Sequence, residues 1–363
     1  MGSNWFPGRW RRLLHGLLVY LGPLVFFEMV GRAYLVWGGL PWNNTLSTYE
    51  NDELLGYRPN PRFFGGDIRF NALGFRSDRE YAAYPAPGTL RVLAVGGSTT
   101  FGSGPSARDA FPARLEETAH QYSLPWEVIN AGVSGWQLFQ IRHSLATWLE
   151  QVHPDVVLFN EGWNTGSKPY QYYRNAHLFT YPLFQYSLIF RLIDRRLRAA
   201  GVSLHYHPFL ETREEVLRKQ ERVNADTAVF DEYEELVRQC VVLCRQAGVT
   251  PVFLLAPGNL PEDLSTSASA YFRGTAQEHH AADYGAMCQA VNRTRDLSAA
   301  RILKTQAELG FAVIDARQAF EGLDYAARQA LFYDEIHPSP AGNTQLARFL
   351  CQVLPGQLGL ARQ

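Results

Sequence analysis

The fold class is decided by Leu90-Arg-Val-Leu-Ala-Val-Gly-Gly-Ser-Thr-Thr-Phe-Gly102. Its first six residues are mostly apolar and rich in valine and leucine, which is typical of a strand buried on both faces. The run ends in a glycine-flanked turn that contains Ser98. A helical pattern follows over residues 110 to about 122, and Asp109 stands where a helix cap is expected. The stretch therefore predicts a strand–turn–helix unit with Ser98 at the turn.

The same strand pattern returns further along the chain. Short apolar runs occur at residues 127–130, 155–159, 250–255 and 312–314. Helical patterns separate most of them, and this alternation predicts an α/β fold with a parallel central sheet covered by helices on both faces. Because parallel strands end at one rim of such a sheet, the turns after the first three strands are expected to lie together there.

Three further blocks carry groups suited to catalysis. Asn130-Ala-Gly-Val-Ser-Gly135 ends the second strand, and Asn160-Glu-Gly-Trp-Asn164 ends the third. Near the C-terminus, Asp334-Glu-Ile-His337 lies in a loop just before a helix expected to start near Ala341. A carboxylate at this spacing can orient the imidazole, which can then take the proton of a serine hydroxyl. One histidine alone is usually structural, but these blocks in this order indicate a serine acyl-transfer site.

The four blocks together resemble those of the SGNH/GDSL hydrolases. The resemblance covers residue 90 to the C-terminus apart from an insertion, and it implies a flavodoxin-like, three-layer α/β/α sandwich. It also implies ester hydrolysis through an acyl-enzyme, with no cofactor and no metal. The implied catalytic residues are Ser98 as nucleophile, Asp334 as orienter and His337 as base, and the implied oxyanion-hole donors are Ser98, Gly135 and the side chain of Asn164.

Two positions depart from the family pattern. Gly97 stands where the family motif has Asp, and Thr165 follows Asn164 where Asp is usual. Neither change removes a reacting group, so the catalytic interpretation stands. Both are expected to alter how firmly the serine and asparagine turns are held.

Residues beside the third block are candidates for substrate binding. Glu161 and Trp163 are the two predicted substrate contacts. Trp163 and the following tyrosines could stack against a sugar or simply pack within the insertion; these tyrosines are Tyr170, Tyr172 and Tyr173. The histidine pairs His205-x-His207 and His279-His280 lack further ligands at metal-binding spacing and are interpreted as surface or structural residues.

The N-terminus indicates attachment to a membrane. Arginines 9, 11 and 12 precede a mostly apolar run over residues 13–37, interrupted by His15, Glu28 and Arg32. A helix of this length can cross about 30 Å of hydrocarbon, and the basic residues before it favour a cytoplasmic N-terminus with the rest outside. A cleaved signal peptide and a helix of a cytosolic protein are the alternatives. Glu28 and Arg32 lie one helical turn apart and could pair.

The predicted organisation has three parts. Residues 1–37 form the anchor or signal segment, residues 38–89 a linker and β-arm, and residues 90–363 the hydrolase domain. A helical and aromatic insertion is expected at about 165–235. With 34 basic and 35 acidic residues the net charge is −1, which gives no electrostatic footprint for nucleic acid. The four cysteines form no CxxC pair and are interpreted as apolar core residues.

These observations favour a membrane-anchored, extracytoplasmic esterase that acts on a small-molecule or glycan ester. O-acetyl groups on a cell-surface or exported glycan are the expected substrate. An O-acyltransferase with the same three catalytic residues is the first alternative. A non-catalytic glycan-binding protein with the same fold is the second, and the intact Ser, His and Asp argue against it.

Overall fold

The computed structural model describes residues 8–38, 47–52, 54–65, 67–104, 106–165, 183, 186–199, 228–259 and 281–360. Most of the insertion expected at 165–235 lies outside these residues. The same holds for five of the motif residues and pairs singled out above, whose roles stay predictions: Tyr170, Tyr172, Tyr173, His205-x-His207 and His279-His280.

A five-stranded parallel sheet forms the centre of the fold. Its strands are β5 (Leu90–Gly96), β6 (Trp126–Gly132), β7 (Val156–Asn160), β8 (Thr250–Leu255) and β9 (Ala312–Asp315), in the spatial order β6-β5-β7-β8-β9. Every strand expected from the sequence is present, and the ends differ by at most two residues. The three central strands are buried along nearly their whole length, as strands covered on both faces must be.

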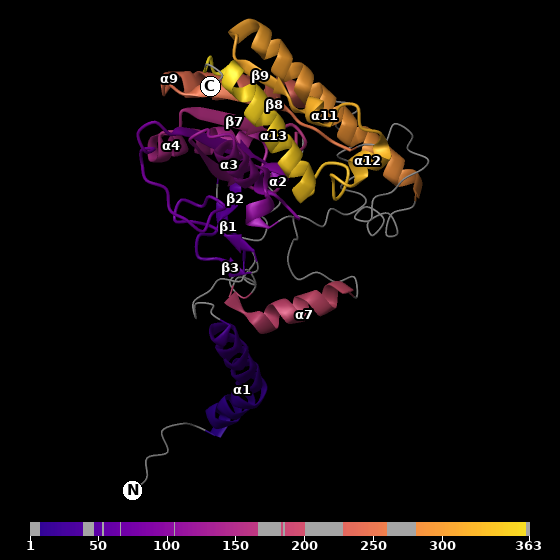
Figure 1. Ribbon diagram of the computed structural model, residues 1–363. Coiled ribbons are helices and arrows are strands. Elements are labelled where there is room, and N and C mark those ends of the chain that lie inside the picture. Colours follow the sequence, from indigo (N-terminus) through magenta and orange to yellow (C-terminus); the bar gives the residue numbers. More distant parts are fainter. Residues whose placement is uncertain are drawn as a thin grey trace.

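Helices α3 and α13 cover one face of the sheet (Figure 1). α3 (Phe111–Gln121) packs against α13 (Pro340–Gln357), and their buried side chains form one apolar cluster with Val92 and Ala94 of β5. Short helices are also present, among them η1 (Ala107–Asp109), η3 (Ala316–Phe320) and α12 (Tyr325–Gln329).

Three longer helices lie on the opposite side of the sheet. They are α4 (Leu138–Val152), α9 (Ala228–Gln246) and α11 (Ala281–Leu309). Leu93 and Val95 of β5 point into this second cluster, so successive residues of one strand serve opposite faces. The two clusters give the three-layer α/β/α sandwich that the sequence predicts.

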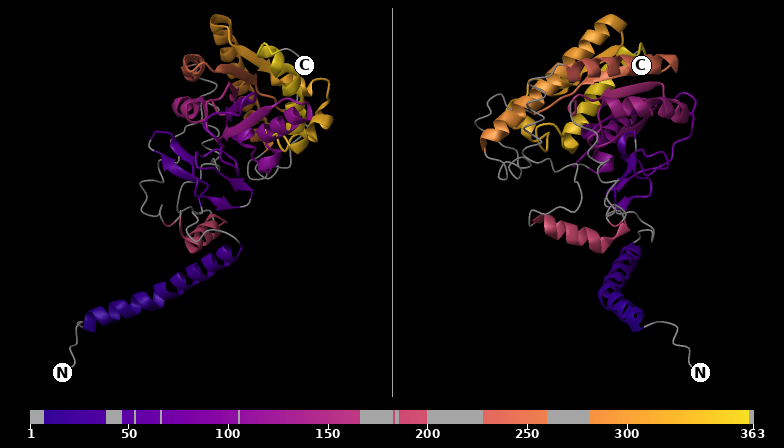
Figure 2. Two further views of the ribbon diagram at one scale, coloured as in Figure 1. Left: turned by 60° about the vertical axis from the view of Figure 1, so that its left-hand side comes forward. Right: turned by 180° about the vertical axis from the view of Figure 1, so that it is seen from behind.

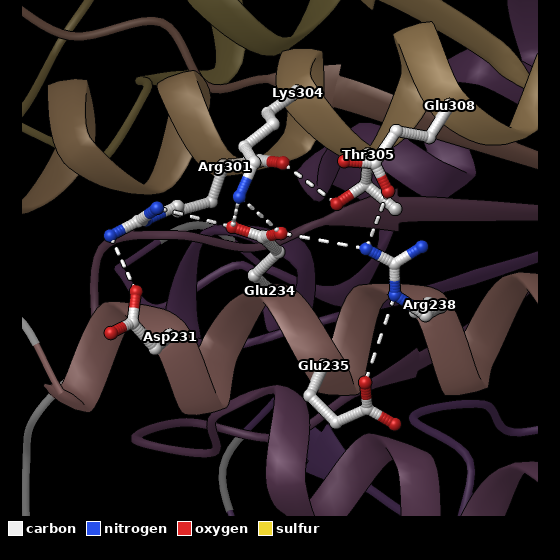
Figure 3. A network of polar contacts seen from close by, with 8 residues as sticks. All are labelled: Asp231, Glu234, Glu235, Arg238, Arg301, Lys304, Thr305 and Glu308. Carbon is white, nitrogen blue, oxygen red and sulfur yellow. Dashed lines mark hydrogen bonds and ion pairs between the residues drawn. The ribbon is translucent and has the colours of Figure 1, made fainter.

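Ion pairs join α9 to α11 (Figure 3). The Glu234 carboxylate of α9 accepts hydrogen bonds from Lys304 Nζ at 2.8 and 3.0 Å and from Arg301 Nη1 at 3.1 Å, both on α11. The hydrogen bond from Lys304, helped by the neighbouring positive charges, lowers the pKa of Glu234 below its usual value. The network fixes α11, which contributes a side chain to the site described below.

The cysteines that the structure describes are core residues. Cys240 and Cys244 lie one turn apart on the buried side of α9, and Cys351 is buried in α13. Burial raises the pKa of both Cys244 and Cys351 to about 12. The interpretation of these three thiols as apolar core groups is confirmed.

The segment before the sheet is more structured than a linker. Strands β1 (Tyr49–Asp52) and β2 (Gly56–Pro59) form an antiparallel hairpin inside the stretch 38–89, which was expected to be a linker and β-arm. A second small hairpin pairs β3 (Phe64–Gly65) with β4 (Ile68–Arg69). Aromatic side chains anchor this lead-in arm to the cluster under α4; they are Tyr49, Tyr57, Phe70 and Phe75.

The expected cap of α3 is wrong. Ala110 is the N-cap and makes no side-chain hydrogen bond, while Asp109 ends the short helix η1. The Asp109 carboxylate instead accepts a 2.7 Å hydrogen bond from Ser106 Oγ and pairs with Arg114. Asp109 thus lies one residue before the N-cap position, and its carboxylate is held by Ser106 and Arg114 instead of the first turn of α3.

Helix α1 (Gly8–Trp37) extends away from the α/β body (Figures 1 and 2). Its segment His15–Trp37 is long and apolar enough to cross a membrane, and none of that segment is buried against the rest of the chain. α7 (Leu188–Ala199) lies near its C-terminal half. The expected pair forms, with Arg32 Nε 3.1 Å from the Glu28 carboxylate.

Candidate active site

Ser98 is the first residue of α2 (Ser98–Phe101), a single helical turn directly after β5. The turn fits tightly against β6, because a side chain at Gly132 would collide with the backbone of Phe101. Gly102 ends the turn with φ +85°, a conformation that glycine adopts without strain. The local sequence thus places the Ser98 hydroxyl at the rim where the parallel strands end.

The loop before α13 is organised by Asp334. One oxygen of its carboxylate, Oδ1, accepts hydrogen bonds from the backbone N–H groups of Ile336 at 2.8 Å and His337 at 2.7 Å. The backbone N–H of Tyr333 donates to the His337 carbonyl at 2.8 Å, which closes the loop. Asp334 is buried, so one oxygen holds the loop while the other faces the imidazole.

Three side chains form a continuous hydrogen-bonded series. His337 Nε2 lies 2.8 Å from Ser98 Oγ, and His337 Nδ1 lies 2.7 Å from Asp334 Oδ2. The serine and the histidine are 239 positions apart in the sequence. The fold therefore brings together the hydroxyl, the imidazole and the carboxylate that the sequence singled out. In this order the imidazole can accept the serine proton and the carboxylate can stabilise the resulting charge.

Asn164 lies against the same turn. Its Nδ2 donates to the Trp136 carbonyl at 2.9 Å. A Cβ atom at Gly97 would lie 2.5 Å from that nitrogen, so only glycine lets the amide approach the turn this closely. This gives a physical reason for the first departure from the family pattern. An amide nitrogen carries two N–H donors, and the Trp136 carbonyl occupies one of them.

Gly135 lies in a loop that the lead-in arm holds on both sides. Its φ of +79° requires glycine or a strained residue. Tyr57 Oη donates to the Ser134 carbonyl at 2.6 Å, and Trp136 Nε1 donates back to the Tyr57 carbonyl at 3.1 Å. The β1–β2 hairpin thus supports the residues immediately before and after Gly135.

Thr165 stands where the family usually has Asp, and it takes over part of the support of the Asn164 turn. It is buried, and its hydroxyl lies 3.0 Å from Ser298 Oγ of α11. Ser298 Oγ also donates to the Gly162 carbonyl at 3.2 Å. The turn that carries Asn164 is therefore held by hydroxyl contacts to α11 in the place where the family usually has a carboxylate.

Glu161 and Trp163, the two predicted substrate contacts, are both largely buried. Glu161 is 4% exposed, and its carboxylate accepts a hydrogen bond from the Gly162 N–H. Trp163 is 6% exposed and lies close to Gly258. It also lines a small pocket with Thr99 and Asn160, and its role in substrate binding stays a prediction.

Arg76, which the sequence analysis missed, holds the end of the turn that carries Ser98. Its guanidinium donates to the carbonyls of Phe101 and Gly102, the latter at 2.6 Å, and lies 4.2 Å from the centre of the Phe101 ring. Burial lowers the pKa of Arg76 to about 10, so it remains charged at neutral pH. A cation at the C-terminal carbonyls of a helix is stabilising. No local motif marks Arg76, because its partners lie 25 residues further along the chain or more.

No cluster of three or more His, Cys, Asp or Glu side chains suited to a metal ion is found within the described part of the chain.

Comparisons with solved structures give distant similarities. A protein described as lipolytic, of the G-D-S-L family, from Desulfitobacterium hafniense is 12% identical; the match covers 73% of this chain and 99% of that one, with a TM-score of 0.41. An acetylxylan esterase from Geobacillus stearothermophilus is 17% identical, with 76% and 97% covered and a TM-score of 0.41. A GDSL-like lipase from Bacteroides thetaiotaomicron is 11% identical, with 75% and 91% covered and a TM-score of 0.40.

No curated protein matches the chain. The sequence model of the GDSL-like lipase/acylhydrolase family does match, over residues 94–345. That span holds more than half of the 363 residues and includes Ser98, Gly135, Asn164, Asp334 and His337. The chain therefore belongs to the GDSL-like lipase/acylhydrolase family.

Proposed function

We propose that the chain is a serine esterase in which Ser98 is the nucleophile, His337 the general base and Asp334 the residue that orients the imidazole. The observation that carries this proposal is the unbroken hydrogen-bonded series from the Ser98 hydroxyl to the Asp334 carboxylate. Family membership supplies the reaction class, which is hydrolysis of an ester-linked acyl group.

The reaction follows from the order of these groups. Ser98 Oγ attacks the ester carbonyl carbon while His337 Nε2 takes its proton, and a tetrahedral intermediate forms. His337 returns that proton to the leaving oxygen as the ester C–O bond breaks, which releases the alcohol and leaves an acyl group on Ser98. Water then attacks the acyl carbon with the same help from His337, and the carboxylic acid departs. The Asp334 carboxylate stabilises the imidazolium in both steps.

The oxyanion of the tetrahedral intermediate needs donors at the same rim. We assign this role to the backbone N–H groups of Ser98 and Gly135 and to the side-chain amide of Asn164. The hydrogen bond from Asn164 to the Trp136 carbonyl supports the assignment, because it fixes the amide and leaves its second N–H available. Each such donor is expected to contribute about 3 kcal/mol to transition-state stabilisation.

The proposal also covers the substrate and the location of the protein. We expect an acetyl ester on a cell-surface or exported glycan, with α1 anchoring the catalytic part outside the cytoplasm. The apolar segment His15–Trp37 supports the anchor, and the three arginines before it support this orientation. Glu161 and Trp163, which neighbour Asn164 in the sequence, are the proposed substrate contacts.

Labelling with a fluorophosphonate tests the nucleophile. The wild-type protein should be modified on Ser98, and Ser98→Ala should abolish the labelling. Ser106→Ala is the matched control, because the Ser106 hydroxyl bonds to Asp109 away from the series and should leave labelling unchanged. Persistent labelling of the Ser98→Ala variant, or none of the wild type, would contradict the proposal.

A panel of esters tests the substrate. Acetyl esters, including acetylated glycans, should be cleaved faster than esters of longer acyl chains. A preference for long chains would contradict the acetyl assignment while leaving the nucleophile in place. Product that forms only when an acceptor alcohol is supplied would identify an acyltransferase with the same site.

A further inference from the structure

We propose that α7 lies on the surface of the membrane that α1 enters, with apolar side chains in the acyl boundary and arginines on the phosphates of anionic lipids. This inference rests on the membrane anchor proposed above. It adds a second, electrostatic contact between the chain and the lipid, made by part of the insertion that follows Asn164.

The sequence of α7 is amphipathic. Leu-Ile-Phe-Arg-Leu-Ile-Asp-Arg-Arg-Leu-Arg-Ala occupies residues 188–199, with its apolar residues recurring at helical spacing. Leu192 is 56% exposed and Ile193 is 44% exposed, so neighbouring large apolar side chains of α7 lie open together. The described residues of the chain do not cover them.

The charge of α7 differs from that of the whole chain. The helix contains four arginines and one aspartate, which gives a net charge of +3, whereas the complete chain carries −1. Arg196 is exposed on the same side of the helix as Leu192 and Ile193, four and three residues before it, so its long side chain can extend from the apolar side to a headgroup. A helix with apolar residues on one side and arginines nearby is the pattern of helices that bind in the plane of an anionic lipid surface.

Contacts with α1 hold the N-terminus of α7 beside Glu28, and so at a defined position along the membrane anchor. The Glu28 carboxylate accepts hydrogen bonds from Ser187 Oγ at 3.0 Å and from the backbone N–H groups of Leu188 and Ile189 at 3.1 Å each. It therefore caps the first turn of α7, and Arg32 bonds to the Tyr186 carbonyl beside it. Figure 1 shows α7 crossing the direction of α1 at this point, as a helix in the membrane plane would.

The position of Glu28 along α1 is close to the boundary between the hydrocarbon core and the headgroups. Glu28 follows Arg12 by 16 residues of α1, which is a rise of about 24 Å along the helix. The hydrocarbon core is about 30 Å thick, so with Arg12 at one boundary Glu28 lies about 6 Å below the other. Interfacial helices bury their apolar faces to about 5–10 Å. The N-terminus of α7 is thus held at the depth that such a helix occupies.

Local probes on the full-length chain test this placement. Single cysteines at Ile193 of α7, Val25 of α1 and Val242 of α9 would each carry an environment-sensitive fluorophore, in a background with Cys288→Ser. The other native thiols are buried. In vesicles of phosphatidylcholine and phosphatidylglycerol, lipids brominated near the headgroup should quench the Ile193 label about threefold more than the Val242 control, which is exposed on the α/β body.

A charge variant tests the lipid contact. Arg196→Glu should reduce the membrane-bound fraction of the Ile193 label by about fivefold or more in anionic vesicles, while Arg196→Lys should leave it nearly unchanged. Quenching at Val25 without quenching at Ile193 would overturn the proposal and leave the anchor intact. Quenching at neither site would overturn both. A label at Ile193 that is shielded from water but not quenched by lipid would show that protein covers α7, which also overturns the proposal.

Discussion

Replacing Arg76 by methionine would test whether the lead-in arm positions the nucleophile. The two hydrogen bonds from this charged side chain to the Phe101 and Gly102 carbonyls contribute about 3–6 kcal/mol. Burial of the charge, which lowers the pKa of Arg76 from 12.5 to about 10, costs about 3 kcal/mol. Because methionine keeps apolar contact with the Phe101 ring, we expect the free energy of unfolding to fall by about 2 kcal/mol.

The effect on catalysis is the sharper readout. Releasing the end of α2 should let Ser98 move relative to His337, so kcat for p-nitrophenyl acetate should fall about tenfold or more with little change in KM. The rate of fluorophosphonate labelling should fall in parallel. Urea unfolding at the same temperature would measure stability separately.

A matched control lies on the same arm. The Arg79 side chain is 47% exposed and pairs with Glu116 at 2.6 Å, so Arg79→Met should cost less than about 1 kcal/mol and leave kcat unchanged. A wild-type kcat in Arg76→Met, despite the expected loss of stability, would refute the idea that Arg76 positions Ser98.

Three further predictions follow from the contacts. Asp334→Asn should keep the fold by circular dichroism and lower kcat by about 10³–10⁴-fold; a loss below tenfold would contradict its orienting role. Gly97→Ala should displace the Asn164 amide and lower kcat about 10–100-fold, whereas Gly356→Ala, where a Cβ meets nothing within 4 Å, should not; equal rates would remove Asn164 from the oxyanion hole. Glu234→Gln should lower the free energy of unfolding by about 1–3 kcal/mol at pH 7. Because a lowered carboxyl pKa stabilises the fold above its unfolded value of 4.5, this difference should disappear as the pH falls through the folded-state pKa of Glu234. A difference that does not shrink as the pH is lowered below 4.5 would contradict the reasoning.

The sheet was predictable because its strands are buried on both faces. That burial requires uninterrupted apolar runs, and such runs stand out in a sequence. The hairpin of β1 and β2 could not be predicted in this way, because β1, Tyr49-Glu-Asn-Asp52, is short and polar apart from its tyrosine. What stabilises it is contact with a loop about 80 residues further along the chain, and no local pattern records such a contact.

The candidate site also contains residues that could be predicted from the sequence and residues that could not. Ser98, Asp334 and His337 could be found because a reaction demands particular groups at particular spacings. The residues that hold them, such as Arg76 and Ser298, act on backbone carbonyls that any sequence would offer. Supporting contacts of this kind appear only when distant segments are brought together by the fold.

The lead-in arm has a practical consequence for anyone who prepares the enzyme without its anchor. Tyr57 exchanges hydrogen bonds with the loop around Gly135, and Asn60 Nδ2 donates to the Ser47 carbonyl at 3.0 Å. A shortened gene that starts just ahead of β5 would discard these supports together with the hydrophobic leader. Expression vectors should retain the codons from Ser47 onward, so that the shortened protein keeps the contacts that hold the loop around Gly135.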